Sequence, residues 1–262
     1  MNKKVALITG SATGLGRRTA VELAKNGIDV VLNYVHSSET AKETSRFISK
    51  TYGVRSIAIQ ADVGLLNDVQ KLVSQTRSVM GGIDILIHNA GPFIKKQKKM
   101  SEYTIEEWNF IINGNLNSVF YLSKEVLPLM RSKRWGRMIT IGFDRVETAP
   151  AWNFRSAYAA AKSGTASLTK TLAIEEAENG ITVNMVCPGD IQGKYKEMNI
   201  EDVRGKNDLD NPVGRTGTGE DIARVISFLC NEDSDFITGS VISVTGGKDV
   251  LNKRVEKHNT EE

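Results

Sequence analysis

The sequence predicts an α/β fold with a doubly wound parallel sheet of seven strands in a single domain. Short runs rich in Val and Ile recur along the chain, and most are continuously apolar, which is typical of strands buried on both faces. Longer segments with helical patterns separate these runs, and such alternation indicates βαβ units. The predicted strands are Val5–Thr9, Asp29–Asn33, Arg55–Gln60, Ile83–His88, Arg137–Ile141, Thr182–Cys187 and Val241–Val244.

Glycines mark the ends of the predicted helices. The helices expected over Leu15–Asn26, Leu65–Met80 and Ala157–Asn179 are each followed by a glycine, the residue preferred just beyond a helix C-terminus. The segment Gln192–Arg215 departs from this pattern because it is charged and contains both glycine and proline. We expect it to form a loop with one short helix.

Length and composition indicate one globular domain. The 262 residues fit a single α/β domain, and no linker or internal repeat divides them. We expect a dinucleotide-binding and catalytic domain over residues 1–250 and a polar tail over residues 251–262. A hydrophobic fraction of 40% and a charged fraction of 25% exclude a disordered or fibrous chain. The net charge of +3 gives little support to nucleic-acid binding.

The sequence gives no indication of a metal-binding, secreted or membrane protein. Cys187 and Cys230 are far apart and in no C-x-x-C pattern, so we expect no disulfide scaffold and no metal site. The apolar run after Lys4 stops at Thr9, too early for a signal peptide. No stretch is long enough to cross a membrane, and we expect a cytoplasmic location.

A glycine-rich turn follows the first predicted strand and leads into a helix. Glycines there permit a tight turn and a close approach of backbone to a pyrophosphate, which the free N–H groups of the helix N-terminus would bind. The position after the first strand is where the mononucleotide-binding unit of a Rossmann-type sheet lies. The predicted cofactor-binding residues of this turn are Gly10, Ser11, Thr13, Gly14, Leu15 and Gly16.

The end of the second predicted strand indicates which dinucleotide binds. An acidic residue there would bind the ribose 2′-OH of NAD. This chain has Asn33 and Tyr34 at that place, and its next acidic residue is Glu39. Neutral donors and the neighbouring Arg17 could accommodate a 2′-phosphate, so we expect NADP(H). The alternative is an ordinary polar loop without a phosphate contact.

Tyr158 and Lys162 form the candidate catalytic pair. They are four residues apart in an alanine-rich segment of high helix propensity, which places both on one helix face. A neighbouring ammonium favours a phenolate and lowers the pKa of a tyrosine, so the pair could act as a general acid or base. An exposed helix pair is the alternative for these two residues taken alone.

Together these motifs resemble the short-chain dehydrogenase/reductase family, and within it the bacterial 3-oxoacyl-[acyl-carrier-protein] reductases. The resemblance extends over about Lys3–Lys248. It rests on the glycine turn and on Ala61-Asp62-Val63, Asn89-Ala90-Gly91, Asn115-Leu116, Tyr158-x-x-x-Lys162, Pro188-Gly189, Ile237-Thr238-Gly239 and Gly246-Gly247.

The resemblance implies a role for each motif. Tyr158 would protonate a carbonyl oxygen, Lys162 would lower the tyrosine pKa and bind the nicotinamide ribose, and Asn115 would hold a water for proton resupply. The further positions implied to border the dinucleotide are Tyr34, Asp62, Val63, Asn89, Ala90, Gly91, Pro188, Gly189 and Ile191. Asp62 and Asn115 could instead be caps.

The family also implies a homotetramer. The helices buried between subunits would be those represented here by Asn115–Arg131 and Ala157–Asn179. The small residues Ala161 and Gly164 on the second helix suit close helix packing.

The chain departs from the family at the serine that orients the substrate carbonyl. Aligned from the fifth strand, that position holds Phe143, and counted back from Tyr158 it holds Arg145. Asp144 could take the role, as an aspartate near this point does in pteridine reductases, or it could pair with Arg145. A family threonine that bonds the nicotinamide carboxamide is replaced by Gly193.

The basic residues that dock an acidic carrier protein in this family are only partly present. Lys133-Arg134 matches one such site, whereas the second falls at Ile174. Glu175, Glu176 and Glu178 follow and should repel an acidic partner. The lysines of the segment 95–99 could compensate or could be a solvated loop.

The sequence thus predicts an NADPH-dependent carbonyl reductase acting on a 3-oxoacyl thioester, either free or bound to an acyl carrier protein. Two alternatives stay open. One is a reductase of another small carbonyl or a pterin-like ring, and the other is a catalytically weak dinucleotide-binding sensor.

Overall fold

The predicted seven-stranded doubly wound sheet is confirmed in a computed structural model, which describes residues 3–251. All strands are parallel, in the order β3-β2-β1-β4-β5-β6-β7. The strands are β1 (Val5–Ile8), β2 (Asp29–Tyr34), β3 (Ser56–Gln60), β4 (Ile85–His88), β5 (Gly136–Ile141), β6 (Ile181–Pro188) and β7 (Val241–Val244). The tail expected over residues 251–262 lies, beyond Leu251, outside the described residues.

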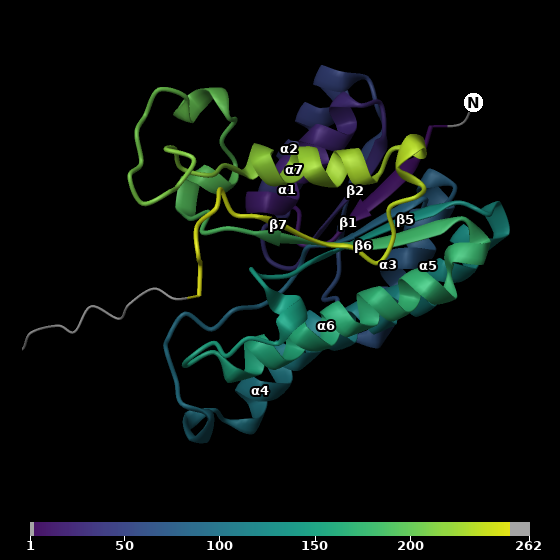
Figure 1. The fold of residues 1–262 in the computed structure, drawn as a ribbon. Coiled ribbons are helices and arrows are strands. Elements are labelled where there is room, and N and C mark those ends of the chain that lie inside the picture. The colour runs from purple at the N-terminus through teal and green to yellow at the C-terminus, as the bar shows by residue number, and fades with distance from the viewer. Residues whose placement is uncertain (1–2, 252–262) are drawn as a thin grey trace, which may run out of the picture.

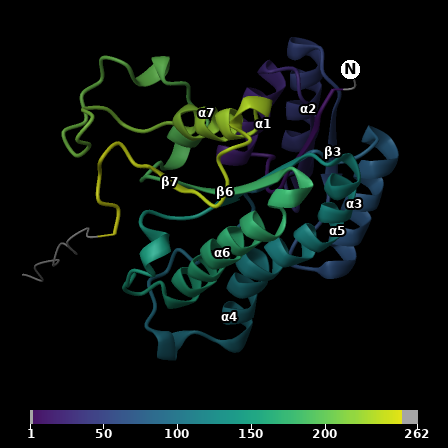
Figure 2. The same cartoon turned by 45° about the vertical axis from the view of Figure 1, so that its right-hand side comes forward.

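Helices cover both faces of the sheet (Figures 1 and 2). They are α1 (Gly14–Lys25), α2 (Ser38–Tyr52), α3 (Leu66–Met80), α4 (Ile105–Ile112), α5 (Ser118–Lys133), α6 (Ser156–Glu175) and α7 (Gly219–Leu229). The first, second and seventh pack on one face, and α3, α5 and α6 on the other, with α4 against α6.

The continuous apolar runs fold as strands because they lie between two helical layers. Every residue of β1, β2, β4 and β5 is buried. In register, Leu7 lies beside Val31 and Leu86, and all three belong to the core under α3 and α5. Their neighbours along each strand point to the opposite core under α1 and α7, as the two-residue period of a strand requires.

Some predicted boundaries differ from those of the structure. The helix expected to reach Asn179 ends at Glu175, and one 3₁₀ turn over Ala177–Asn179 follows it. The segment 192–215 holds two short 3₁₀ helices, Gly193–Lys196 and Glu201–Val203, where one helix was expected. In Figures 1 and 2 this segment lies on the side of the sheet that α1 and α7 cover.

The strand order locates the site. The chain leaves β1 toward β2 on one side, whereas β4 continues toward β5 on the other, so the crossover point lies between β1 and β4. Ligands of open parallel sheets bind at the carboxyl ends of the strands at this point. The glycine turn follows β1 and the Asn89-Ala90-Gly91 segment follows β4, so both predicted motifs lie there.

Residues 3–251 contain neither a membrane-spanning helix nor a cluster of metal-binding side chains. None of the helices in this range is long and apolar enough to cross a membrane. Within the same range, no three His, Cys, Asp or Glu side chains gather in a way that could hold a metal ion.

Candidate functional site

Two asparagines hold the glycine turn in place. Asn33, at the end of β2, accepts a hydrogen bond from the Gly10 N–H at 3.2 Å and donates to the Ala61 carbonyl at 2.9 Å. Asn89, after β4, donates to the carbonyls of Thr9 and Gly10 at 2.9 and 3.0 Å. The turn is therefore bonded to both neighbouring strands. The sequence analysis noted at Asn33 only that the position holds no acidic residue. It did not predict that the Asn33 side chain would hold the turn.

Gly16 must be a glycine because backbone and side-chain atoms crowd its α-carbon. A Cβ at this position would lie 2.5 Å from the Asn89 amide nitrogen and 2.6 Å from the Gly10 carbonyl oxygen. Because Gly16 has no side chain, α1 can start close to Asn89, which follows β4. The N-terminus of α1 therefore lies at the crossover point.

The two hydroxyl residues of the turn differ from each other. The Ser11 hydroxyl donates to the Ile8 carbonyl at 2.7 Å and accepts from the Asn33 N–H at 3.1 Å. Its side chain is fully buried and braces the turn, and its contact with the cofactor stays a prediction. Thr13 is exposed at the N-cap of α1 and makes no capping hydrogen bond, which leaves its hydroxyl at the predicted site.

Arg17 does not stand free for a 2′-phosphate. Its guanidinium lies 2.8 Å from one oxygen of Glu197, and the other Glu197 oxygen accepts from the Gly14 N–H at 2.6 Å. A carboxylate of the segment between β6 and α7 thus occupies the two groups expected to bind phosphates. No pattern in the sequence indicated this contact.

The residues predicted to border the adenine line the next part of the edge. Tyr34 is buried against Ala12 and Ala41, and its hydroxyl lies 3.2 Å from that of Ser38. Val63 is buried, while Asp62 accepts from the Gly64 N–H at 2.9 Å. Asp62 therefore caps this loop, as its alternative interpretation stated.

The predicted catalytic residues are brought together at the carboxyl end of β5. Tyr158 and Lys162 lie on α6, and the Lys162 Nζ is 5.7 Å from the centroid of the tyrosine ring. The ammonium donates to the Ile141 carbonyl at 2.8 Å. Gly91 lies against both Lys162 and Asn115, since a Cβ there would be 3.3 Å from the Lys162 Nζ and 2.5 Å from the Asn115 Oδ1.

Asn115 lies in a π-helical turn, Asn113–Asn117, between α4 and α5. Its amide nitrogen donates to the carbonyls of Pro92 and Ile111 at 2.9 and 3.0 Å. Its Oδ1 is buried and has no hydrogen-bond partner among the described residues. A buried amide oxygen without a partner is costly, so this atom is suited to accept from a water or ligand.

Burial controls the titration of the pair. It raises the pKa of the Tyr158 phenol to about 12 and lowers the pKa of the Lys162 ammonium to about 8. For the chain alone, burial therefore dominates, and the pKa of Tyr158 lies above its ordinary value although the Lys162 ammonium is near. At neutral pH the phenol is protonated and the lysine largely charged.

Comparison with known proteins identifies the family. The sequence matches the family described as "Enoyl-(Acyl carrier protein) reductase" over residues 10–249, most of the chain. The chain belongs to the short-chain dehydrogenase/reductase family.

Two relatives cover nearly the full length. "Putative oxidoreductase YtkK" of Bacillus subtilis is 48% identical and aligns with 95% of this chain and 97% of its own. The 3-oxoacyl-[acyl-carrier-protein] reductase FabG of Staphylococcus epidermidis is 36% identical, over 94% of this chain and 99% of its own.

Solved structures agree. A Bacillus thuringiensis protein described as a "putative 3-oxoacyl-reductase" superimposes with a TM-score of 0.88 at 48% identity, covering 95% of this chain and 99% of its own. A blue fluorescent protein from a metagenomic library, in complex with NADPH, has a TM-score of 0.81 at 31% identity, with coverage of 94% and 98%.

At the family's serine position, this dehydrogenase/reductase presents Phe143. Its ring is buried and lies 4.9 Å from the Trp152 ring and 6.4 Å from the Tyr158 ring, measured between centroids. The Asp144 carboxylate is engaged with other side chains. It accepts a hydrogen bond from the Ser243 hydroxyl at 3.2 Å and lies 3.5 Å from the Arg145 guanidinium. The structure thus favours the ion-pair interpretation of Asp144 over the substrate-binding one.

Phe93 and Arg155 are site residues that the sequence analysis missed. The Phe93 ring meets the Tyr158 ring edge-on, with centroids 5.1 Å apart. The Arg155 guanidinium lies over the Phe93 ring, 4.5 Å from its centroid, and donates to the carbonyls of Lys95 and Lys96 at 2.9 and 3.0 Å. An arginine three residues before the predicted catalytic tyrosine was the available signal.

The motif after β6 borders the same edge. Gly189 lies against Thr245, where a Cβ would be 2.8 Å from the Thr245 Cα, and Pro188 ends the strand. Ile191 is buried against the α1 and α7 core. Gly193 has a φ of +51°, a conformation that glycine adopts readily.

The expected carrier-docking residues lie elsewhere or are neutralised within the chain. Lys133 pairs with Asp84 at 2.6 Å, just before β4 and therefore at the opposite edge of the sheet from Tyr158. Glu176 is buried and paired with Arg131, so the repulsion expected from this residue is wrong. Lys98 pairs with Glu107.

The small residues of α6 pack within the chain. Ala161 is buried beside Ile111, and a Cβ on Gly164 would be 3.2 Å from the Leu116 side chain. The close packing of these residues is therefore made within the chain, with α4 and the π-helical turn.

Proposed function

We propose that this family member is an NADPH-dependent carbonyl reductase in which Tyr158 donates the proton. The observation that carries the proposal is the convergence of Tyr158, Lys162, Asn115 and Gly91 at the carboxyl end of β5, beside the glycine turn. Three separate segments supply these groups, so their convergence is a property of the fold and not of one motif.

The residues fit a dinucleotide. The Gly14 N–H at the start of α1 already donates to a carboxylate, as it could to a phosphate, and the buried Asn115 Oδ1 lacks a partner among the described residues. We assign phosphate binding to Gly14, Leu15 and Thr13, the adenine side to Tyr34, Asp62 and Val63, and the nicotinamide side to the Asn89 and Pro188 motifs. When bound, the nicotinamide supplies the hydride.

The chain's own residues handle the proton. The Tyr158 hydroxyl, protonated at neutral pH, donates to the carbonyl oxygen as negative charge develops there. The Lys162 ammonium stabilises the resulting phenolate by its charge. Asn115 accepts a hydrogen bond from a water that resupplies the proton through Lys162.

We propose a 3-oxoacyl thioester as the substrate, supported by the FabG relative at 36% identity. A smaller carbonyl compound is the second candidate. It is favoured by Phe143 and Trp152, which set aromatic rings beside Tyr158 where the family has a hydroxyl donor, and by Lys133, which is engaged at the opposite edge.

The test follows NADPH absorbance with acetoacetyl-CoA and, in parallel, with a panel of small ketones and diketones. We expect turnover that the Tyr158→Phe variant loses while it keeps NADPH affinity. Turnover confined to the panel would select the second candidate. NADPH binding without turnover on any carbonyl would refute the reductase and indicate a sensor.

A further inference from the structure

The Glu197 carboxylate bridges the two groups best placed to bind phosphate. One oxygen accepts from the Gly14 N–H at 2.6 Å and the other lies 2.8 Å from the Arg17 guanidinium. Both contacts are charge-assisted, and phosphate oxygens would make the same two. Glu197 and a dinucleotide phosphate therefore compete for one set of donors.

The backbone around Glu197 is anchored on both sides. Just before it, the Lys196 carbonyl packs on Gly219, where a Cβ would be only 1.8 Å from the carbonyl oxygen. Just after it, the Ile200 N–H donates to Glu220 at 2.7 Å. The chain is thus fixed on α7, and the Glu197 side chain is what reaches α1.

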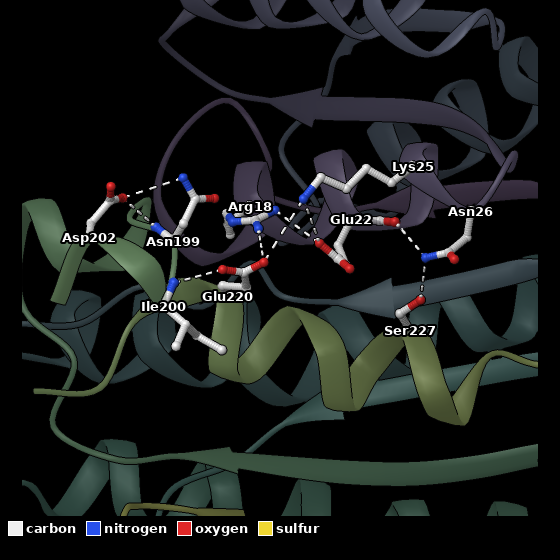
Figure 3. Close-up of polar contacts among 9 residues, drawn as sticks. All are labelled: Arg18, Glu22, Lys25, Asn26, Asn199, Ile200, Asp202, Glu220 and Ser227. Carbon is white, nitrogen blue, oxygen red and sulfur yellow. Dashed lines mark hydrogen bonds and ion pairs between the residues drawn. The ribbon is translucent and has the colours of Figure 1, made fainter. Parts of the chain in front are cut away.

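Figure 3 shows how this anchor is tied to α1. Glu220 lies 2.9 Å from the buried Arg18, which is also 3.2 Å from Glu22 on the same helix. Asp202 accepts from the Asn199 N–H at 2.8 Å and closes the turn. Because none of these contacts involves Glu197, its carboxylate can leave Gly14 while the anchor stays.

From this geometry we infer that Glu197 sets the balance between NADPH and NADH at this site. The inference rests on the proposed function. The carboxylate neutralises Arg17 and competes with phosphate, so it opposes the binding of both dinucleotides. NADPH carries an additional phosphate, so it loses more from a nearby negative charge and from a neutralised arginine than NADH does.

Glu197→Gln tests the inference, with Kd values for NADPH and NADH measured by quenching of the chain's tryptophan fluorescence or by calorimetry. We expect NADPH affinity to rise about fivefold, the upper range for a part-exposed ion pair, and NADH affinity to rise less than about twofold. Glu201→Gln is the matched control, because Glu201 is exposed on the next 3₁₀ helix and pairs with Arg204.

A second variant separates the electrostatic role from a local folding effect. In an Arg17→Gln background, Glu197→Gln should favour NADPH over NADH less than it does in the native chain. The arginine that it would release is gone, and only the removal of the negative charge remains. Equal changes for the two dinucleotides, unchanged affinities or weakened NADPH binding in Glu197→Gln would each overturn the inference. If the unmodified chain binds neither dinucleotide, the proposed function fails; if it binds both and the variant behaves like the control, only the inference fails.

Discussion

Lys162 approaches Tyr158 from one helical turn along α6, with its Nζ 5.7 Å from the phenol centroid, and its ammonium is held by the Ile141 carbonyl at 2.8 Å. The backbone of β5 therefore fixes the lysine, and the helix fixes the tyrosine relative to it. Because the lysine donates to a carbonyl and not to the phenol, it can act on Tyr158 only through space in the chain alone.

The first prediction concerns the ionisation of Tyr158. Burial raises its pKa to about 12, so residue 158 should contribute no phenolate across the neutral and mildly alkaline range. The difference in near-ultraviolet absorbance between the native chain and Tyr158→Phe, recorded during an alkaline titration, isolates this residue from the other tyrosines. Lys162→Met should leave the difference unchanged there. A phenolate signal near neutral pH would contradict the dominance of burial.

The second prediction concerns the crowding at Gly16. An added methyl group would meet the Asn89 amide at 2.5 Å and the Gly10 carbonyl at 2.6 Å, and neither can move without breaking the turn. Gly16→Ala should lower the free energy of unfolding by about 1–3 kcal/mol and abolish dinucleotide binding. Urea denaturation and fluorescence titration measure the two effects.

Gly164→Ala is the control for Gly16→Ala. Its methyl group would meet only the flexible end of the Leu116 side chain, 3.2 Å away, and no atom of the glycine turn. We expect it to keep dinucleotide affinity. Retained affinity in Gly16→Ala would show that the close approach to Asn89 is not required.

The fold could be predicted because its main signal is local. A strand buried on both faces is apolar at every position, so β1, β2, β4 and β5 stand out in the sequence alone. By contrast, α2 was not predicted. It is rich in Ser, Thr, Lys and Glu and buries only Ala41, Thr44, Ser45 and Ile48, so its apolar stripe is weak.

Apart from the positions that the family resemblance implied, the site was predictable only where its members are close in sequence. Tyr158 and Lys162 share a helix face at a spacing of four residues. The Glu197 contact with Gly14 spans 183 residues, and the Phe93 ring reaches Tyr158 from another segment, so no local pattern reveals either. The direction of the Tyr158 pKa depends on burial, which spacing does not determine.

The third prediction concerns acid stability. His88 is buried beside Thr140 at the end of β4, and neither ring nitrogen has a hydrogen-bond partner among the described residues. Burial, aided by the charge of Lys162, lowers its pKa from 6.5 to about 3. Between pH 6.5 and about pH 3, His88 is protonated in the unfolded chain but neutral in the folded chain. The free energy of unfolding should therefore fall as pH decreases from 6.5, by up to about 1.4 kcal/mol per pH unit.

Urea denaturation at several pH values checks the third prediction. His88→Asn removes the titrating group, so its stability should depend less on pH over the same range. His36→Asn, at an exposed position, should keep the pH dependence of the native chain. If His88→Asn and His36→Asn show the same slope, His88 is not the group responsible.

The last prediction concerns Arg155, which joins the start of α6 to the segment after Gly91. Its guanidinium donates to the carbonyls of Lys95 and Lys96 and packs on Phe93, whose ring contacts Tyr158. Arg155→Ala should release this segment and lower kcat/KM for the carbonyl substrate about tenfold, with most of the change in KM, because two or more hydrogen bonds are lost.

The affinity for NADPH separates this positioning role from a general loss of structure. The contacts of Arg155 are with the segment around Phe93 and not with Gly14 or the other proposed phosphate-binding groups, so Arg155→Ala should keep the NADPH Kd of the native chain. Arg155→Lys should recover only part of kcat/KM, because one ammonium cannot reproduce the forked donors and the ring contact together. Arg204→Ala, which removes an exposed arginine paired only with Glu201, serves as the control. An Arg155→Ala variant with the kinetics of this control would show that Phe93 holds its place against Tyr158 without the arginine.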